Sequence, residues 1–149
     1  MNTWNEYIKA INCIVNRTDY LYEKWAKQQS VNSYLLMILY MLSAADINTQ
    51  KEIANIYGMP KQTVNTVITD LHKKGYIKLI PNEKDKRSKV IKLTDEGMQY
   101  ADAIVNPLLS CEKNVLEKMG EKRVGMLIDT MNQYADLLEK EFNKFNNLK

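Results

Sequence analysis

The residues of this sequence that could carry a function are basic and amide side chains, concentrated between Lys61 and Lys92. This segment holds nine lysine and arginine residues and three acidic ones, a net charge of +6, whereas the rest of the chain carries −3. Its most basic stretch, Pro81–Gly97, ends in the residues VIKLTDEG, which are typical of a strand followed by a capped helix. A basic patch on a mildly acidic body indicates a polyanion as the partner.

Residues for enzyme chemistry or metal binding are scarce. There is one histidine, His72, and the two cysteines, Cys13 and Cys111, lie far apart without metal-ligand spacing. No HExxH, CxxC, GxSxG or glycine-rich phosphate motif is present. We therefore expect no enzyme activity, no cofactor and no metal. Without a signal peptide or an apolar run of bilayer length, we also expect a cytoplasmic protein with no membrane contact.

Residues 61–74 predict an amphipathic helix of unusual polarity. Val64, Val67, Ile68 and Leu71 form its apolar stripe. The opposite face is short, polar and largely uncharged, and consists of Lys61, Gln62, Thr63, Asn65, Thr66 and Thr69. Amides pair with adenine and threonine contacts the thymine methyl group, so this face suits the reading of base edges. Phosphate contact or simple exposure is the alternative for each residue.

The remaining periodicities and caps predict the elements that position these residues. Thr49 and Glu52 form a capping box, and Gly58 and Gly75 end the next two helices. The short helix after Thr49 is expected to bury Ile53, Ala54 and Ile56, and Pro60 to take the first position of the following helix. The expected helices span 3–27, 33–44, 50–57, 61–74, 95–119 with a kink at Pro107, and 121–146, with strands at 76–81 and 88–94.

This order predicts a mainly α fold with a small β-hairpin wing. It is a winged helix-turn-helix, flanked by N- and C-terminal dimerisation helices. We expect one domain over residues 1–149, with the DNA-binding core at 30–97 and the dimerisation helices at 1–28 and 98–149. The basic turn is then the tip of the wing, where it can reach phosphates or a minor groove.

The segments TQKEIANIYGMPKQTVNTVITDLHKKGYIKLI and NEKDKRSKVIKLTDEG resemble the winged-helix core of MarR/SlyA-type transcriptional regulators. The most specific part is the wing pattern D-x-R-S followed by LT-x-x-G, which covers Asp85, Arg87, Ser88, the pair Leu93–Thr94 and Gly97. The resemblance extends from about Asn32 to Leu109.

The resemblance implies a homodimer held by the outer helices, which binds a roughly palindromic operator and usually represses transcription. It implies that Arg87 enters the minor groove while Asp85 helps to hold the wing. A small aromatic or anionic effector often releases DNA in such proteins, and others respond to cysteine oxidation. The DNA-binding residues expected here are Lys51, Lys61, Gln62, Thr63, Asn65, Thr66, Thr69, Lys73, Lys84, Asp85, Lys86, Arg87, Ser88 and Lys89.

The recognition helix departs from the family pattern at Thr66, where many members carry arginine. The strongest bidentate contact to guanine is therefore absent at this position. Lys61, Gln62 and Asn65 are left with more of the base readout.

Effector sensing has weaker signals than DNA binding. The aromatic residues of the first two predicted helices, Trp4, Tyr7, Trp25, Tyr34 and Tyr40, suit a dimer core, and an aromatic-ligand pocket is the alternative. The candidate pocket residues are Tyr7, Ile11, Tyr34 and Tyr40.

Cys13 has two interpretations. A small buried helix residue is the commoner role, and a redox-sensing thiol is the alternative. His72 is expected on the helix surface. For the whole chain, the alternative to a DNA-binding regulator is a winged helix that binds another protein.

Overall fold

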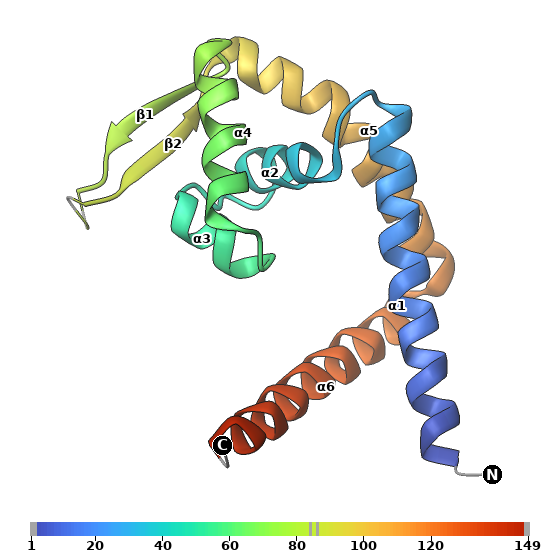
Figure 1. Cartoon of the computed structure of the whole chain (residues 1–149). Coiled ribbons are helices and arrows are strands. Elements are labelled where there is room, and N and C mark those ends of the chain that lie inside the picture. Colours follow the sequence, from blue (N-terminus) through green and yellow to red (C-terminus); the bar gives the residue numbers. More distant parts are fainter. Residues whose placement is uncertain (1–2, 84, 86, 148–149) are drawn as a thin grey trace. The chain divides into compact units, whose positions relative to one another are not determined.

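The computed structural model describes residues 3–83, 85 and 87–147, and it is mainly helical with one two-stranded antiparallel hairpin (Figure 1). This confirms the predicted fold class. The chain divides into two compact units between Asn106 and Pro107, within one helix. The elements are α1 (Thr3–Gln28), α2 (Ser33–Ser43), α3 (Gln50–Ile56), α4 (Lys61–Lys73), β1 (Ile77–Pro81), β2 (Lys89–Leu93), α5 (Asp95–Met119) and α6 (Glu121–Asn147).

Helix α2 is the centre of the first unit. Its sequence is apolar nearly all round, and Leu36, Ile38, Leu39 and Met41 are completely buried. The side chain of Asn32 caps the helix by accepting a hydrogen bond from the backbone N–H of Leu35 at 2.8 Å. Because α1, α4 and β2 all contact α2, this buried helix fixes the frame on which the helix-turn-helix and the hairpin are mounted.

The helix-turn-helix consists of α3 and α4. Thr49 caps α3 by accepting from the N–H of Glu52, as the capping box predicts. Ile53 and Ala54 are buried, but the expectation for Ile56 is wrong, since its side chain is 56% exposed. Ile56 lies about 110° around the helix from the centre of the buried face. Met59, from the following turn, is buried instead.

The turn into α4 shows one further difference from expectation. Pro60 precedes the helix as its N-cap residue, with an extended ψ of 129°, and the helix begins at Lys61. The apolar stripe is as predicted at Val64, Ile68 and Leu71, which are buried. Its opposite side is therefore available to solvent.

The wing is a hairpin in which Ile77 pairs with Leu93, and Lys78 with Lys92. Ile77 and Ile91 are buried, so one face of the hairpin packs on the core. The segment before α3 adds to the second edge of β2, because the N–H of Ile91 donates to the carbonyl of Asn48 at 2.7 Å. The second strand of the wing is thereby joined to the segment that leads into the helix-turn-helix.

The second unit contains the rest of α5, with Pro107 inside the helix, and α6. None of the described residues of α6 is buried in the single chain. Its exposed apolar side chains include Leu127, Met131, Tyr134, Leu138, Phe142 and Phe145. Among the described helices, none combines the length and apolar character needed to cross a membrane.

Candidate nucleic-acid interface

Helix α4 presents a polar, mostly uncharged face. Gln62, Asn65, Thr66 and Thr69 are exposed, whereas Thr63 is half-buried. The hydroxyl of Thr66 donates to the carbonyl of Gln62 at 2.9 Å, one turn back in the helix. Its proton is therefore engaged by the backbone, and its methyl group and oxygen lone pairs remain for an outside partner. One exposed lysine lies at each end of this face, Lys61 at the start of α4 and Lys73 at its end.

The wing tip is ordered by the carboxylate and carbonyl of Asp85. The carboxylate accepts from the backbone N–H of Arg87 at 3.0 Å, and the carbonyl accepts from the N–H of Ser88 at 2.9 Å. The Ser88 hydroxyl donates to the same carbonyl and accepts from the amide of Asn82 at 2.9 Å. These bonds close the turn from inside, and none of them engages the Arg87 guanidinium. The predicted DNA-binding residues Lys84 and Lys86 lie outside the described residues.

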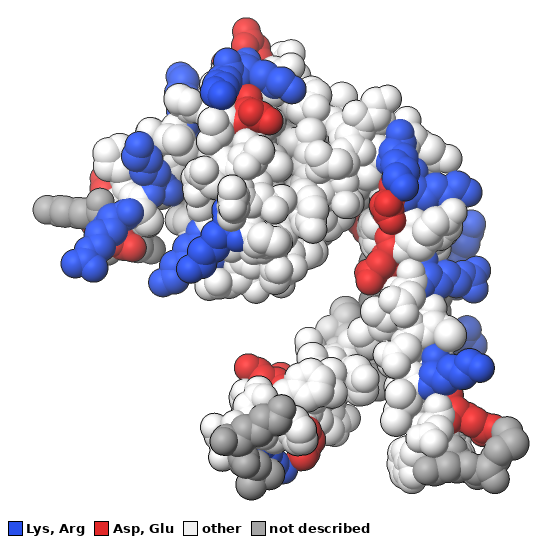
Figure 2. Space-filling model, in the orientation of Figure 1, with Lys and Arg blue, Asp and Glu red and all other residues white. Residues whose placement is uncertain are grey.

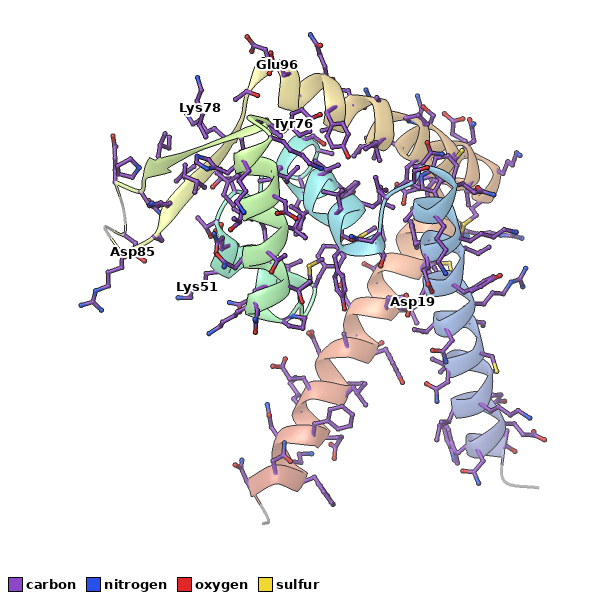
Figure 3. All side chains as sticks on the ribbon, turned by 45° about the horizontal axis from the view of Figure 1, so that its top comes forward. Asp19, Lys51, Tyr76, Lys78, Asp85 and Glu96 are labelled. Atoms are coloured by element: carbon purple, nitrogen blue, oxygen red, sulfur yellow. The ribbon has the colours of Figure 1, made fainter. Side chains whose placement is uncertain are left out.

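Basic side chains gather over the hairpin, α3 and the end of α4 in the space-filling view (Figure 2). Lys51 on α3 and Asp85 at the wing tip lie on the same side of the winged helix (Figure 3). The ion pairs found in the described part of the chain lie on α1, α5 and α6. Lys51, Lys61, Lys73, Arg87 and Lys89 are exposed and form none of them. An unpaired basic surface of this kind attracts polyanions.

Lys78 and Lys92 contribute to the charge of the wing, but they are not among the predicted DNA-binding residues. The register of the hairpin sets Lys78 directly opposite Lys92, and both are exposed. Like charges in this position repel each other, and within the described residues neither lysine has an acidic partner. The alternation of apolar and polar residues in each strand was the signal that could have paired them.

The candidate effector residues lie on two helices and differ in exposure. Tyr7 and Tyr34 are exposed and Ile11 and Tyr40 are half-buried, two on α1 and two on α2. An opening of about 350 Å³ at the α1–α2 turn contains none of the four. It is lined by Glu23, Lys27, Ser30, Val31, Asn32 and Ser33.

Cys13, His72 and possible metal-ligating groups are the remaining candidates from the sequence. Cys13 is exposed in the single chain, which differs from the buried position expected for it. The reason is that α1 contributes only Ala26 to the core of the single chain. His72 is exposed, as expected. No group of three or more metal-ligating side chains occurs among the residues that the structure describes.

Comparison with known proteins places this architecture in a family. Residues 33–88 match the family model described as MarR family. The structure of NMB1585, a MarR family regulator from Neisseria meningitidis, is similar with a TM-score of 0.80 and 30% sequence identity, over 97% of this chain and 99% of that one. The chain belongs to the MarR family. As a MarR family member it is a DNA-binding transcriptional regulator and not an enzyme, as the sequence predicted.

Two further similarities extend the comparison of this MarR family protein. The transcriptional repressor MprA of Escherichia coli K12 is 25% identical over an alignment of 129 positions, and the alignment covers 78% of this chain and 73% of MprA. A MarR family transcriptional regulator from Listeria monocytogenes, solved in complex with a 26mer DNA, shares the fold with a TM-score of 0.68 and 18% identity. That similarity covers 90% of this chain and 89% of that one.

Proposed function

We propose that this MarR family protein is a repressor that binds a pseudo-palindromic operator as a homodimer and releases it when a small effector binds. The observation that carries the proposal is the uncharged amide and hydroxyl face of α4 beside an unpaired basic wing. The amides of Gln62 and Asn65 suit base edges in the major groove, and Arg87 suits the adjacent minor groove. The similarity to a protein named as a repressor supports the direction of control.

The homodimer is supported by the apolar surface of the outer helices. Trp4 on α1 is 73% exposed, and Phe142 and Phe145 on α6 are 59% and 61% exposed. Large apolar side chains exposed in this number along a helix are uncommon on monomeric proteins, and a second copy of the chain would cover those of each helix without any other partner. The proposed division of the chain is a winged-helix core at 30–97, with dimerisation helices at 1–28 and 98–149.

The proposed effector is a small aromatic molecule, because the tyrosines of α1 and α2 keep part of their rings accessible. Tyr7, Ile11, Tyr34 and Tyr40 are the residues proposed to receive it. A chromosomal operator would place this regulator in the cytoplasm. A thermal-shift screen of simple phenols tests the effector, and a shift lost in Tyr34→Ala but kept in Tyr20→Ala supports this location.

The homodimer and the operator are tested together. An operator is first selected from a random DNA library with the wild-type protein, and binding is then measured by fluorescence anisotropy. Sedimentation equilibrium should give twice the chain mass of 17.4 kDa, and the selected sequence should contain two inverted half-sites. Phe142→Lys should weaken both dimer and operator binding, whereas the neighbouring Asn143→Lys adds the same charge and should change little. A monomer with a single asymmetric site would contradict the proposal.

A further inference from the structure

Four elements of the winged-helix unit meet at Thr94. Its backbone N–H donates to the carbonyl of Tyr76 at 3.0 Å, and its hydroxyl donates to the carbonyl of Gly75 at 2.8 Å. The same hydroxyl accepts from the N–H of Gly97, in the first turn of α5, at 3.0 Å. Since Gly75 and Tyr76 form the turn between α4 and β1, one side chain ties the end of the recognition helix to the start of α5.

The contact at Gly97 leaves no room for a side chain. A Cβ atom at this position would lie 2.7 Å from the carbonyl carbon of Tyr76 and closer still to its oxygen. Gly97 is helical and has no positive φ, so space rather than backbone conformation requires glycine here. The atoms that a methyl group would meet are backbone atoms, which cannot rotate away. Helix α5 therefore rests directly on the peptide of Tyr76.

One turn further along α5, Tyr100 extends this contact. Its ring stacks on the ring of Tyr76, with centroids 4.5 Å apart and planes inclined by 13°. Figure 3 shows Tyr76 at the point where α4, β1 and α5 come together. The stack and the hydrogen bonds of Thr94 hold α5 at two points separated by a helical turn, so they restrain its direction as well as its position.

Other contacts of α5 restrain its direction less. Ala101, Ile104 and Val105 are buried, but apolar burial has no directional preference. The hydrogen bonds of Thr94 and the close approach of Gly97 are directional, because small rotations break them. This junction, defined as Gly75, Tyr76, Thr94, Gly97 and Tyr100, is therefore suited to setting the angle between α4 and α5.

We infer that the junction positions the recognition helix relative to α5 and thereby sets which spacing of operator half-sites the protein accepts. This inference rests on the proposed homodimer, in which the second half of α5 belongs to the dimerisation helices. A helix of the length of α4 spans roughly 20 Å, so a rotation of about 5° at one end moves the other by about 2 Å. Applied in both protomers, the shift is comparable with the rise of about 3.4 Å between base pairs.

The test compares Thr94→Val with Thr94→Ser in the full-length protein. Valine keeps the shape but removes the hydroxyl that joins Gly75 to Gly97, whereas serine keeps the hydroxyl. Each protein is titrated by fluorescence anisotropy on the selected operator, on versions with one base pair inserted or deleted between the half-sites, and on an isolated half-site. Circular dichroism verifies that each variant is folded at the assay temperature.

Wild type and Thr94→Ser should prefer the selected spacing by at least about tenfold, a difference of about 1.4 kcal/mol. Thr94→Val should reduce this preference to about threefold or less, mainly through weaker affinity for the selected spacing, while its half-site affinity stays within about twofold of wild type. A Thr94→Val protein with the wild-type spacing preference overturns the inference. A wild-type protein that is indifferent to spacing contradicts the proposed homodimeric operator instead.

A second pair of variants keeps the test decisive if Thr94→Val does not fold. Tyr100→Phe keeps the ring that stacks on Tyr76, and Tyr100→Leu removes the stack but stays apolar. Tyr100→Leu should reduce the spacing preference and Tyr100→Phe should retain it. Equal spacing preferences for the two variants would overturn the inference, because the stack would then not restrain the direction of α5.

Discussion

The carboxylate of Asp85 binds the backbone N–H of Arg87 at 3.0 Å, while the guanidinium of Arg87 forms no ion pair within the described residues. An acid and a base two residues apart at an exposed tip could have neutralised each other. Here the acid orders the turn and the base keeps its full charge for an outside partner. The wing therefore presents the Arg87 guanidinium on a turn whose backbone is held by hydrogen bonds to Asp85.

Arg87→Ala should weaken binding to the selected operator by at least about tenfold, or about 1.4 kcal/mol. A guanidinium is less tightly hydrated than an ammonium and enters a narrow, electronegative minor groove at lower cost. Arg87→Lys should therefore recover only part of the affinity. The exposed tip contributes little to the core, so thermal unfolding and sedimentation should match wild type. An Arg87→Ala protein that binds as wild type would favour the protein-interaction alternative.

The hydrogen bond that Asp85 accepts from the Arg87 N–H and the negative charge of Asp85 can be separated by substitution. Asp85→Asn keeps an oxygen that can accept from the Arg87 N–H and removes a negative charge beside DNA. We expect it to bind the operator as tightly as wild type or more tightly, with the largest gain at low salt. Asp85→Ala lacks the acceptor and should bind several-fold more weakly than Asp85→Asn. Anisotropy titrations at several salt concentrations measure both, and equal affinities would show that the hydrogen bond does not order the tip.

Gln62→Ala and Asn65→Ala should relax base preference at defined operator positions, and each removed hydrogen-bonded pairing with a base should cost about 1–3 kcal/mol of binding free energy. Both side chains are exposed on the uncharged face of α4, so the substitutions should not alter the fold. Binding is measured on operators substituted at single positions. A decrease in affinity that is uniform across all sequences would instead identify a phosphate contact.

The order and limits of the elements followed from local rules in the sequence. Gly58, Gly75 and Gly120 end three helices with φ of 58°, 75° and 80°, a conformation that other residues rarely adopt. Thr49 caps α3 as its spacing to Glu52 indicated. Such signals lie within a few residues of the feature they specify, so a single sequence contains them.

Features that depend on contacts distant in sequence were missed. The stack of Tyr76 on Tyr100 and the bond from Thr94 to Gly75 need the chain to return to its own turn after the wing. The burial of Met59 in place of Ile56 depends on how the α3–α4 turn meets the core. Periodicity cannot distinguish these cases, because it counts residues along one element and contains no information about its neighbours.

The same limit applies to the candidate DNA-binding residues. The basic wing and the polar face of α4 could be proposed from composition and spacing. The network that leaves Arg87 unpaired could not, since it depends on the path of the turn through Asp85 and Ser88. Their contacts with DNA stay predictions, which the substitutions above address.

The raised pKa of Tyr100 predicts that the folded protein loses stability at alkaline pH. Burial, with a smaller contribution from Tyr76, raises the pKa of Tyr100 above its ordinary value of 10.0. The folded state thus favours the neutral phenol, and the unfolded chain loses this proton first as the pH rises. The stabilising contribution is complete below pH 10 and is lost as the pH rises through the folded-state pKa.

Melting temperatures followed by circular dichroism from about pH 8 to pH 11 should fall less steeply above pH 10 in Tyr100→Phe than in wild type. Identical slopes for Tyr100→Phe and wild type would show that the phenol of Tyr100 ionises equally readily in the folded and unfolded states.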